Sequence, residues 1–100
     1  MAQGINVIDY ATLTVGASAV TLVTDASPTL PAKCKRAYIT CRANAVSWRA
    51  DGTAPVAATD HIIAANDAIS FTGANYRQLL EKIQFIQDSA GATLQITYFD

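Results

Sequence analysis

The sequence predicts an all-β fold, an antiparallel β-sandwich of about eight strands with a jelly-roll or immunoglobulin-like outline. Apolar and polar residues alternate with a period of two in short stretches, which is the spacing of half-buried strands. Turn-forming residues separate these stretches at intervals of about ten residues, as in sandwiches. The 100 residues of the chain supply one hydrophobic core but not two. We therefore expect a single domain.

The first strands follow from this alternation. Residues 10–15 form the first secure strand, because every second side chain is apolar, and residues 19–24 form the next. The second strand ends in a turn before Pro28, whose ring removes a backbone donor from the ladder. In both strands the core-facing side chains are predicted to be Ala11, Leu13, Val15, Val20 and Leu22.

Residues 36–42 and 45–50 read as a pair of strands joined by a hairpin turn at Ala43-Asn44. Arg36, Tyr38, Thr40 and Arg42 then face outward, opposite Ala37, Ile39 and Cys41 in the core. In the returning strand Val46, Trp48 and Ala50 share one side and Ser47 and Arg49 share the other, so that Trp48 is predicted to anchor the core.

The second half of the chain repeats the pattern. Asp51-Gly52, followed by Pro55, predicts a tight turn, because glycine supplies a positive φ. Residues 76–83 contain apolar side chains three and four positions apart, which indicates one helical turn. The remaining strands are predicted over residues 61–64, 68–72 with Ile69 and Phe71 buried together, 83–87 and 93–99.

Residues 1–9 precede the first secure strand and include Ile5, Val7 and Ile8, which need an apolar partner surface. We expect this segment to be either an added strand of the core or a docking arm that extends a neighbour's sheet. Residues 10–100 then form the single β-sandwich domain.

Charge is sparse. Only 15% of the residues are charged, against about 25% in an average globular domain, so much of the surface must be neutral. A neutral surface suits a protein that packs against other subunits, although a small-residue β protein has the same composition. The net charge of −1 leaves no positive field for phosphates, and we expect no nucleic-acid partner.

The two cysteines, Cys34 and Cys41, lie seven positions apart. This spacing places them on opposite faces of a continuous strand, which disfavours a disulfide, and without a second cysteine pair it disfavours a zinc site. We interpret Cys41 as a core residue. The sequence shows no signal peptide and no apolar run long enough to cross a bilayer, which predicts a soluble, intracellularly synthesised protein without a membrane partner.

The residues for catalysis are few. The chain has one histidine, His61, and one glutamate, Glu81. Asp60 precedes His61, but neighbouring residues of a strand point to opposite faces, so they do not form a dyad. Serine elbows, metal-ligand spacings and glycine-rich phosphate loops are absent from the sequence. We therefore expect no enzyme, cofactor or metal.

The candidate partner-binding residues are apolar or aromatic side chains of the N-terminal segment and basic or aromatic side chains of the predicted outward strand faces. An ordinary solvated strand face is the alternative interpretation of the basic ones. These candidates are Ile5, Val7, Ile8, Tyr10, Arg36, Tyr38, Arg42 and Arg49.

The order of motifs from Ala32 to Phe99 resembles small all-β virion proteins of bacteriophages. The most telling part is the turn Trp48-Arg-Ala-Asp-Gly-Thr-Ala-Pro55. The other matching segments are Lys35-Arg-Ala-Tyr-Ile-Thr40, Val46-Ser47, Asp60-His-Ile-Ile63, Ile69-Ser-Phe-Thr-Gly73, Ile83-Gln-Phe-Ile86 and Ala92-Thr-Leu-Gln-Ile-Thr-Tyr-Phe99.

This resemblance implies a structural virion protein that decorates and stabilises the capsid lattice by binding the major capsid protein or other virion subunits, as a homo-oligomer for which a trimer is the first expectation. A tail or head-fibre accessory role is the alternative within that class. A carbohydrate- or receptor-binding sandwich is an alternative from another class, with Tyr10, Tyr38, Tyr76 and Tyr98 as candidate groove residues.

Overall fold

The computed structural model describes residues 6–57 and 59–100. Over this part of the chain it contains eight strands and one helix. In chain order these are β1 (Val7–Val15), β2 (Val20–Thr21), β3 (Arg36–Ala43), β4 (Val46–Arg49), β5 (His61–Ile63), β6 (Ala68–Phe71), α1 (Arg77–Lys82), β7 (Gln84–Gln87) and β8 (Ala92–Phe99).

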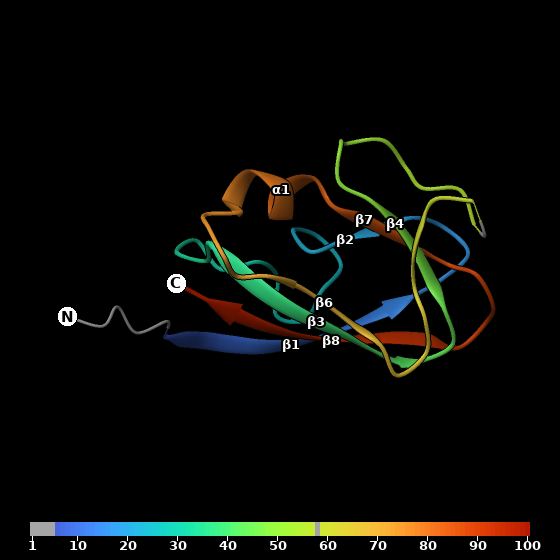
Figure 1. Cartoon of the computed structure of the whole chain (residues 1–100), viewed down its shortest axis with the longest axis horizontal. Coiled ribbons are helices and arrows are strands. Elements are labelled where there is room, and N and C mark those ends of the chain that lie inside the picture. The colour runs from blue at the N-terminus through green and yellow to red at the C-terminus, as the bar shows by residue number, and fades with distance from the viewer. Residues whose placement is uncertain (1–5, 58) are drawn as a thin grey trace.

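The strands form two four-stranded antiparallel sheets that pack face to face (Figure 1). The β1 sheet has the order β1-β8-β3-β6, and the β2 sheet has the order β2-β7-β4-β5. Strands from opposite ends of the chain therefore pair, β1 with β8, β2 with β7, β3 with β6 and β4 with β5. This nested pairing defines an eight-stranded jelly roll and not an immunoglobulin sandwich, whose sheets have a different order.

The core lies between the sheets, and the alternation in the sequence identifies most of it. The predicted inward residues of the first and third strands, Ala11, Leu13, Val15, Ala37, Ile39 and Cys41, are all buried. Both cysteines are buried and free. In β8 the residues Leu94, Ile96 and Tyr98 complete the inner face of the β1 sheet. The predicted antiparallel sandwich is confirmed.

The predicted helical turn is also confirmed as α1, which lies beside the β2 sheet in the connection from β6 to β7 (Figure 1). Leu80 is buried in the core, and Arg77 ties the helix to the segment before β3 by donating hydrogen bonds to the carbonyl oxygens of Pro31 and Cys34. Over the described part of the chain, no helix is long or apolar enough to cross a membrane.

The second predicted strand, residues 19–24, is too long, because β2 ends at Thr21. Asp25 closes a turn there. Its carboxylate accepts hydrogen bonds from the backbone N–H of Thr21 at 2.9 Å and from the Thr24 hydroxyl at 2.8 Å, and its own N–H donates to the Thr21 carbonyl. These bonds replace the ladder bonds of a longer strand. Leu22 is nevertheless buried, as predicted.

The predicted hairpin at Ala43-Asn44 is wrong, because β3 belongs to the β1 sheet and β4 belongs to the β2 sheet. The chain crosses between the layers at this point. Asn44 has φ 60°, in the left-handed region that asparagine tolerates, and its side chain donates a 2.7 Å hydrogen bond to the Ala90 carbonyl. The same turn chemistry therefore serves a crossover between layers.

The predicted inner face of β4 is confirmed, because Val46 is buried and Trp48 and Ala50 pack against the core, but the burial of two side chains differs from the prediction. Ser47 is fully buried, and Trp48 is half-buried at the margin of the core. Ser47 is accommodated because its hydroxyl donates a 2.6 Å hydrogen bond to the Asp88 carboxylate. Trp48 stays at the margin because it pairs with His61 on β5, the edge strand of the β2 sheet.

Replacing Ser47 with alanine is expected to lower the free energy of unfolding by about 1.5–3 kcal/mol, the range for a hydrogen bond to a charged group. Chemical denaturation of the two proteins at neutral pH measures this difference. Ser70→Ala is the matched control, because Ser70 is exposed on β6. A loss no larger than that of the control would contradict a stabilising role for the Ser47–Asp88 bond.

Gly91 occupies a position that other residues do not fit. Its φ is +91°, and a Cβ atom there would lie 3.1 Å from Nδ2 of Asn44. We expect Gly91→Ala to lower the free energy of unfolding by about 1–2 kcal/mol. Gly16→Ala is the matched control, because a Cβ at Gly16 meets no atom within 4 Å. Equal urea midpoints for the two variants would contradict this expectation.

Candidate functional site

The outer face of the β1 sheet carries a row of side chains that runs across its four strands. Tyr10 on β1 pairs with Thr97 on β8, Thr97 pairs with Tyr38 on β3, and Tyr38 pairs with Ser70 on β6. Strand neighbours of Thr97 and Tyr38 are buried, so these side chains point away from the core. The two tyrosines are thus brought onto one surface, on either side of β8.

We name this surface the Tyr10–Tyr38 face. Apart from Arg36 and Arg42, the described outward-facing residues of β1, β3 and β8 are uncharged. Tyr10 is 66% exposed, Val7 48% and Tyr38 43%. The face consists of Val7, Tyr10, Thr12 and Thr14 from β1, Arg36, Tyr38, Thr40 and Arg42 from β3, and Thr93, Gln95, Thr97 and Phe99 from β8.

The structure brings most of the predicted partner-binding residues to this face. Val7, Tyr10 and Tyr38 lie on it, and Ile8 lies in the register shift between Val7 and Asp9 at its margin. Arg42 is exposed at the corresponding register shift of β3. Ile5 falls outside the described residues. Residues 7–9 belong to the same strand as residues 10–15.

One end of the Tyr10–Tyr38 face is fastened by the two ends of the described chain. The N–H and the side-chain amide of Asn6 each donate a 3.1 Å hydrogen bond to the Asp100 carboxylate, and Asp100 N–H donates to the Asn6 carbonyl. Hydrogen bonds from the Asn6 backbone and side chain lower the pKa of Asp100. Arg36 donates to the Asp100 carbonyl, so its guanidinium is held at this end of the face.

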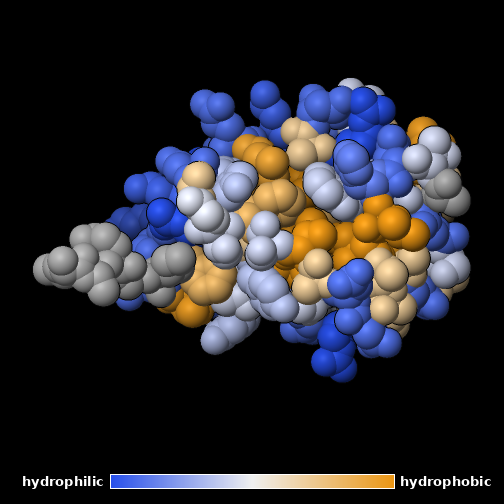
Figure 2. Space-filling view, in the orientation of Figure 1, coloured by the Kyte–Doolittle hydropathy of each residue, from blue (hydrophilic) through white to orange (hydrophobic). Residues whose placement is uncertain are grey.

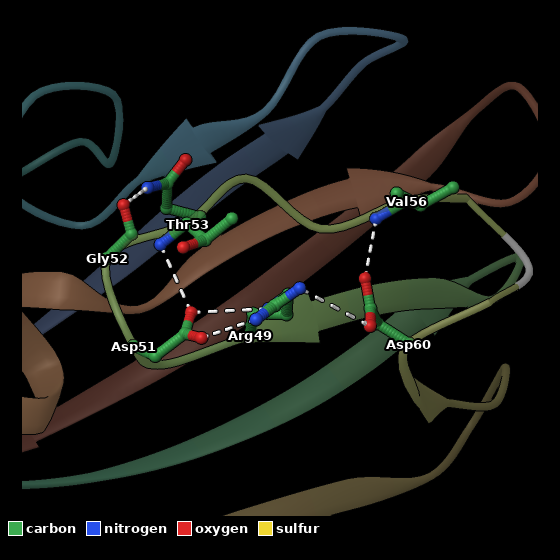
Figure 3. A network of polar contacts seen from close by, with 7 residues as sticks. Arg49, Asp51, Gly52, Thr53, Val56 and Asp60 are labelled. Carbon is green, nitrogen blue, oxygen red and sulfur yellow. Dashed lines mark hydrogen bonds and ion pairs between the residues drawn. The ribbon is translucent and has the colours of Figure 1, made fainter.

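Arg49, the remaining predicted partner residue, lies on the other sheet. Its guanidinium binds Asp51 and lies 4.0 Å from the Asp60 carboxylate (Figure 3). The hydrogen bond with Arg49 is the main cause of the lowered pKa of Asp51. Asp51 also accepts from the Thr53 N–H at 3.1 Å, and Asp60 from the Val56 N–H at 2.7 Å. Arg49 therefore fixes the ends of the loop between β4 and β5.

A second group of residues, which the sequence does not reveal, forms a row of four rings. The ring centroids of His61 and Trp48 lie 4.9 Å apart, those of Trp48 and Phe71 5.9 Å, and those of Phe71 and Tyr76 5.5 Å. We name it the aromatic row. It joins both sheets and the residue before α1. His61 is exposed, and the other three rings are half-buried.

A shallow hollow lies at each end of the aromatic row. The first, of about 420 Å³, is lined by Trp48, Arg49, Ala50, Asp51, Asp60 and His61. The second, of about 400 Å³, is lined by Asn75, Tyr76, Arg77, Gln78 and Leu79. Among the residues that the structure describes, no three His, Cys, Asp or Glu side chains converge as metal ligands.

Two of the predicted groove tyrosines therefore lie on the Tyr10–Tyr38 face, and Tyr76 lies in the aromatic row. Tyr98 is buried in the core, where its hydroxyl donates a 3.1 Å hydrogen bond to the Pro28 carbonyl, and so it does not line a groove. The fold and these surfaces define an eight-stranded jelly roll with two candidate binding regions. Comparisons with protein-family models, curated proteins and solved structures find no match to the chain.

Proposed function

We propose that this protein is a non-catalytic structural subunit that docks on a larger protein assembly through the Tyr10–Tyr38 face. The observation that carries the proposal is the outer face of a four-stranded sheet, on which Tyr10 and Tyr38 are exposed on either side of β8 and Arg36 and Arg42 are the charged residues among the described outward positions of β1, β3 and β8. Interface cores are depleted of charge and enriched in tyrosine. The Tyr10–Tyr38 face has two exposed tyrosines and few charged residues.

The rigidity of the face supports the same proposal. Strand β8 pairs with β1 on one side and with β3 on the other, so Thr97 and its neighbours are held by two ladders. Threonine and tyrosine lose little conformational freedom when they are already ordered in a sheet. A stiff surface of this kind pays a small entropic cost on docking.

The assembly that we propose is a bacteriophage particle, on which this chain acts as a decoration protein bound to the major capsid protein or to other virion subunits. Two arguments favour it, the resemblance inferred from the motifs of residues 32–99 and the jelly-roll topology, an architecture that occurs in viral capsid domains. The second is an argument by analogy of fold. Small subunits that make several contacts at once gain strength from multivalency, which favours a homo-oligomer.

The test is sedimentation of the purified chain with phage particles from its source, after its oligomeric state is measured by size-exclusion chromatography with light scattering. Wild type is expected to be a discrete oligomer and to bind particles. The double variant Tyr10→Lys/Tyr38→Lys is expected to bind at least about a hundredfold more weakly, because tyrosine anchors contribute about 2 kcal/mol each.

Val56→Lys is the matched control, since Val56 is 57% exposed on the loop between β4 and β5, away from the Tyr10–Tyr38 face. It is expected to bind like wild type. Separating heads from tails before sedimentation distinguishes a decoration protein from a tail accessory protein. A monomer that is absent from particles, or a double variant that binds normally, would overturn the proposal.

A further inference from the structure

We infer that the aromatic row and its two flanking hollows form a groove that binds a neutral oligosaccharide. The groove lies on the side of the jelly roll where β5 and β6 end the two sheets, and it uses none of the residues of the Tyr10–Tyr38 face. The inference is therefore independent of the proposed docking function, and one protein could bind a particle and a sugar at the same time.

The two open sides of the sandwich differ in how far their edge strands are covered. On the β1 side, Thr12 and Ser27 exchange backbone hydrogen bonds of 3.0 Å, so a loop covers part of the strand edge. On the other side, β6 and β5 are the last strands of their sheets, and Ile69 and Phe71, although on inward positions, stay half-buried. Figure 2 shows hydrophobic residues gathered in the middle of one side of the molecule, with hydrophilic residues around them.

The aromatic row supplies the apolar part of a sugar site. The C–H groups of a pyranose ring carry partial positive charge and pack against the negative face of an aromatic ring. The planes of successive rings are inclined by 34°, 83° and 62°, and each step of the row is about as long as one sugar unit. A twisted row of this length matches a short chain of linked sugars better than a single sugar.

The hollows supply the polar part. In the first hollow Arg49 is paired with Asp51 and Asp60, and beside the second hollow Arg77 is paired with Glu81 at 2.9 Å. The Arg77–Glu81 pair is neutral, and the Arg49 cluster has one carboxylate more than it has guanidinium groups, so these charges offer little to an anionic ligand. A paired carboxylate still has free lone pairs, and a paired guanidinium still has free N–H groups.

Hydroxyl groups suit such a site, because each can donate to a carboxylate and accept from a guanidinium. Asn75 and Gln78 add amide groups of the same double character at the second hollow. The Arg49 network also holds its side chains in place through Thr53 and Val56, so that little conformational entropy is lost when a ligand binds. These properties favour a neutral, polyhydroxylated ligand.

The chain provides its own reporter, because Trp48 is its only tryptophan and lies inside the aromatic row. We propose to screen the wild-type protein on an array of bacterial and animal glycans, and to titrate it with maltotetraose, chitotetraose and any array hit while recording tryptophan emission. Saturable binding of a neutral oligosaccharide with a change in Trp48 emission is the expected result.

His61→Ala is the informative variant, since His61 is exposed and removing its ring leaves the core unchanged. It is expected to weaken sugar binding about tenfold. Gln78→Ala tests the second hollow in the same way, and Tyr38→Lys is the control that should bind sugar normally.

No binding anywhere on the array, or binding that His61→Ala and Gln78→Ala leave unchanged, would overturn the inference. A concentration-dependent change in emission without sugar would assign the groove to a second copy of the chain and would also overturn it.

Discussion

Replacing Phe85 with alanine is expected to lower the free energy of unfolding by about 3–5 kcal/mol, the range for deleting a buried aromatic side chain. Phe85 is fully buried and is one of the two largest side chains in the core. It lies on β7, between Val20 of β2 and Trp48 of β4, so its loss leaves a cavity under three strands of the β2 sheet. The two edge strands of this sheet are short, with two residues in β2 and three in β5.

Chemical denaturation at neutral pH measures this loss. Phe99→Ala is the matched control, because Phe99 is a half-buried phenylalanine on the outer face of β8 and its removal opens no cavity between the sheets. If Phe85→Ala does not fold, Phe85→Leu gives the same comparison with a smaller cavity. Equal losses at the two positions would contradict the assignment of Phe85 to the centre of the core.

The long strands could be predicted from the sequence because each contains its own signal. In β1, β3 and β8 every second side chain is buried, so local alternation is enough to define both the strand and its inner face. The helical turn at residues 77–82 has the same kind of local signal. Residues 20–21 and 46–49 carry the same alternation, but it does not show where β2 ends or how deeply the side chains of β4 lie. The Asp25 carboxylate ends β2 at Thr21, and the Asp88 carboxylate allows Ser47 to be buried.

The jelly-roll topology could not be predicted, because it depends on pairs that are distant in the sequence. Val7 pairs with Phe99 and Val20 pairs with Phe85, whereas the turn at Ala43-Asn44 has the local chemistry of a hairpin and joins two different sheets. A turn residue with positive φ reverses the chain without specifying which strands will be neighbours. Only the nested pairing of strands over the whole chain distinguishes a jelly roll from an immunoglobulin-like sandwich.

The candidate sites also contain some features with a local signal in the sequence and others that depend on residues distant in the sequence. Exposure of Tyr38 followed from the alternation within its own strand, but its place on one surface with Tyr10 depends on Thr97 between them. The aromatic row has no local signal at all, since its rings come from β4, β5, β6 and the residue before α1. Trp48 has the residue type and spacing of a core anchor, and only the open end of the β2 sheet leaves it at the margin.

The stability of the protein is expected to fall steeply at alkaline pH. Burial raises the pKa of Tyr98 well above its usual range, and burial likewise raises the pKa values of Cys34 and Cys41. The neutral forms of these groups are therefore favoured in the folded state. In the unfolded chain the thiols lose protons near pH 8.5 and the phenol near pH 10, at about their ordinary pKa values.

The sign of the effect follows from proton binding. Above these unfolded pKa values the unfolded chain binds fewer protons than the folded protein, so the free energy of unfolding decreases as pH rises. The contribution is fully present at neutral pH. Tyr98 adds a slope of about 1.4 kcal/mol per pH unit once the phenol of the unfolded chain is ionised, and the two thiols act in the same direction.

Urea denaturation between neutral pH and about pH 11, with a reducing agent present, measures this slope. Tyr98→Phe is the decisive variant, because it keeps the ring in the core and removes only the ionisable hydroxyl that binds the Pro28 carbonyl. It is expected to be less stable than wild type at neutral pH by about 1 kcal/mol. Its stability should then decline more gently above pH 10, so that the two curves converge. Parallel curves would show that Tyr98 ionises as readily in the folded protein as in the unfolded chain. They would contradict the burial of Tyr98 as a cause of the loss of stability at alkaline pH.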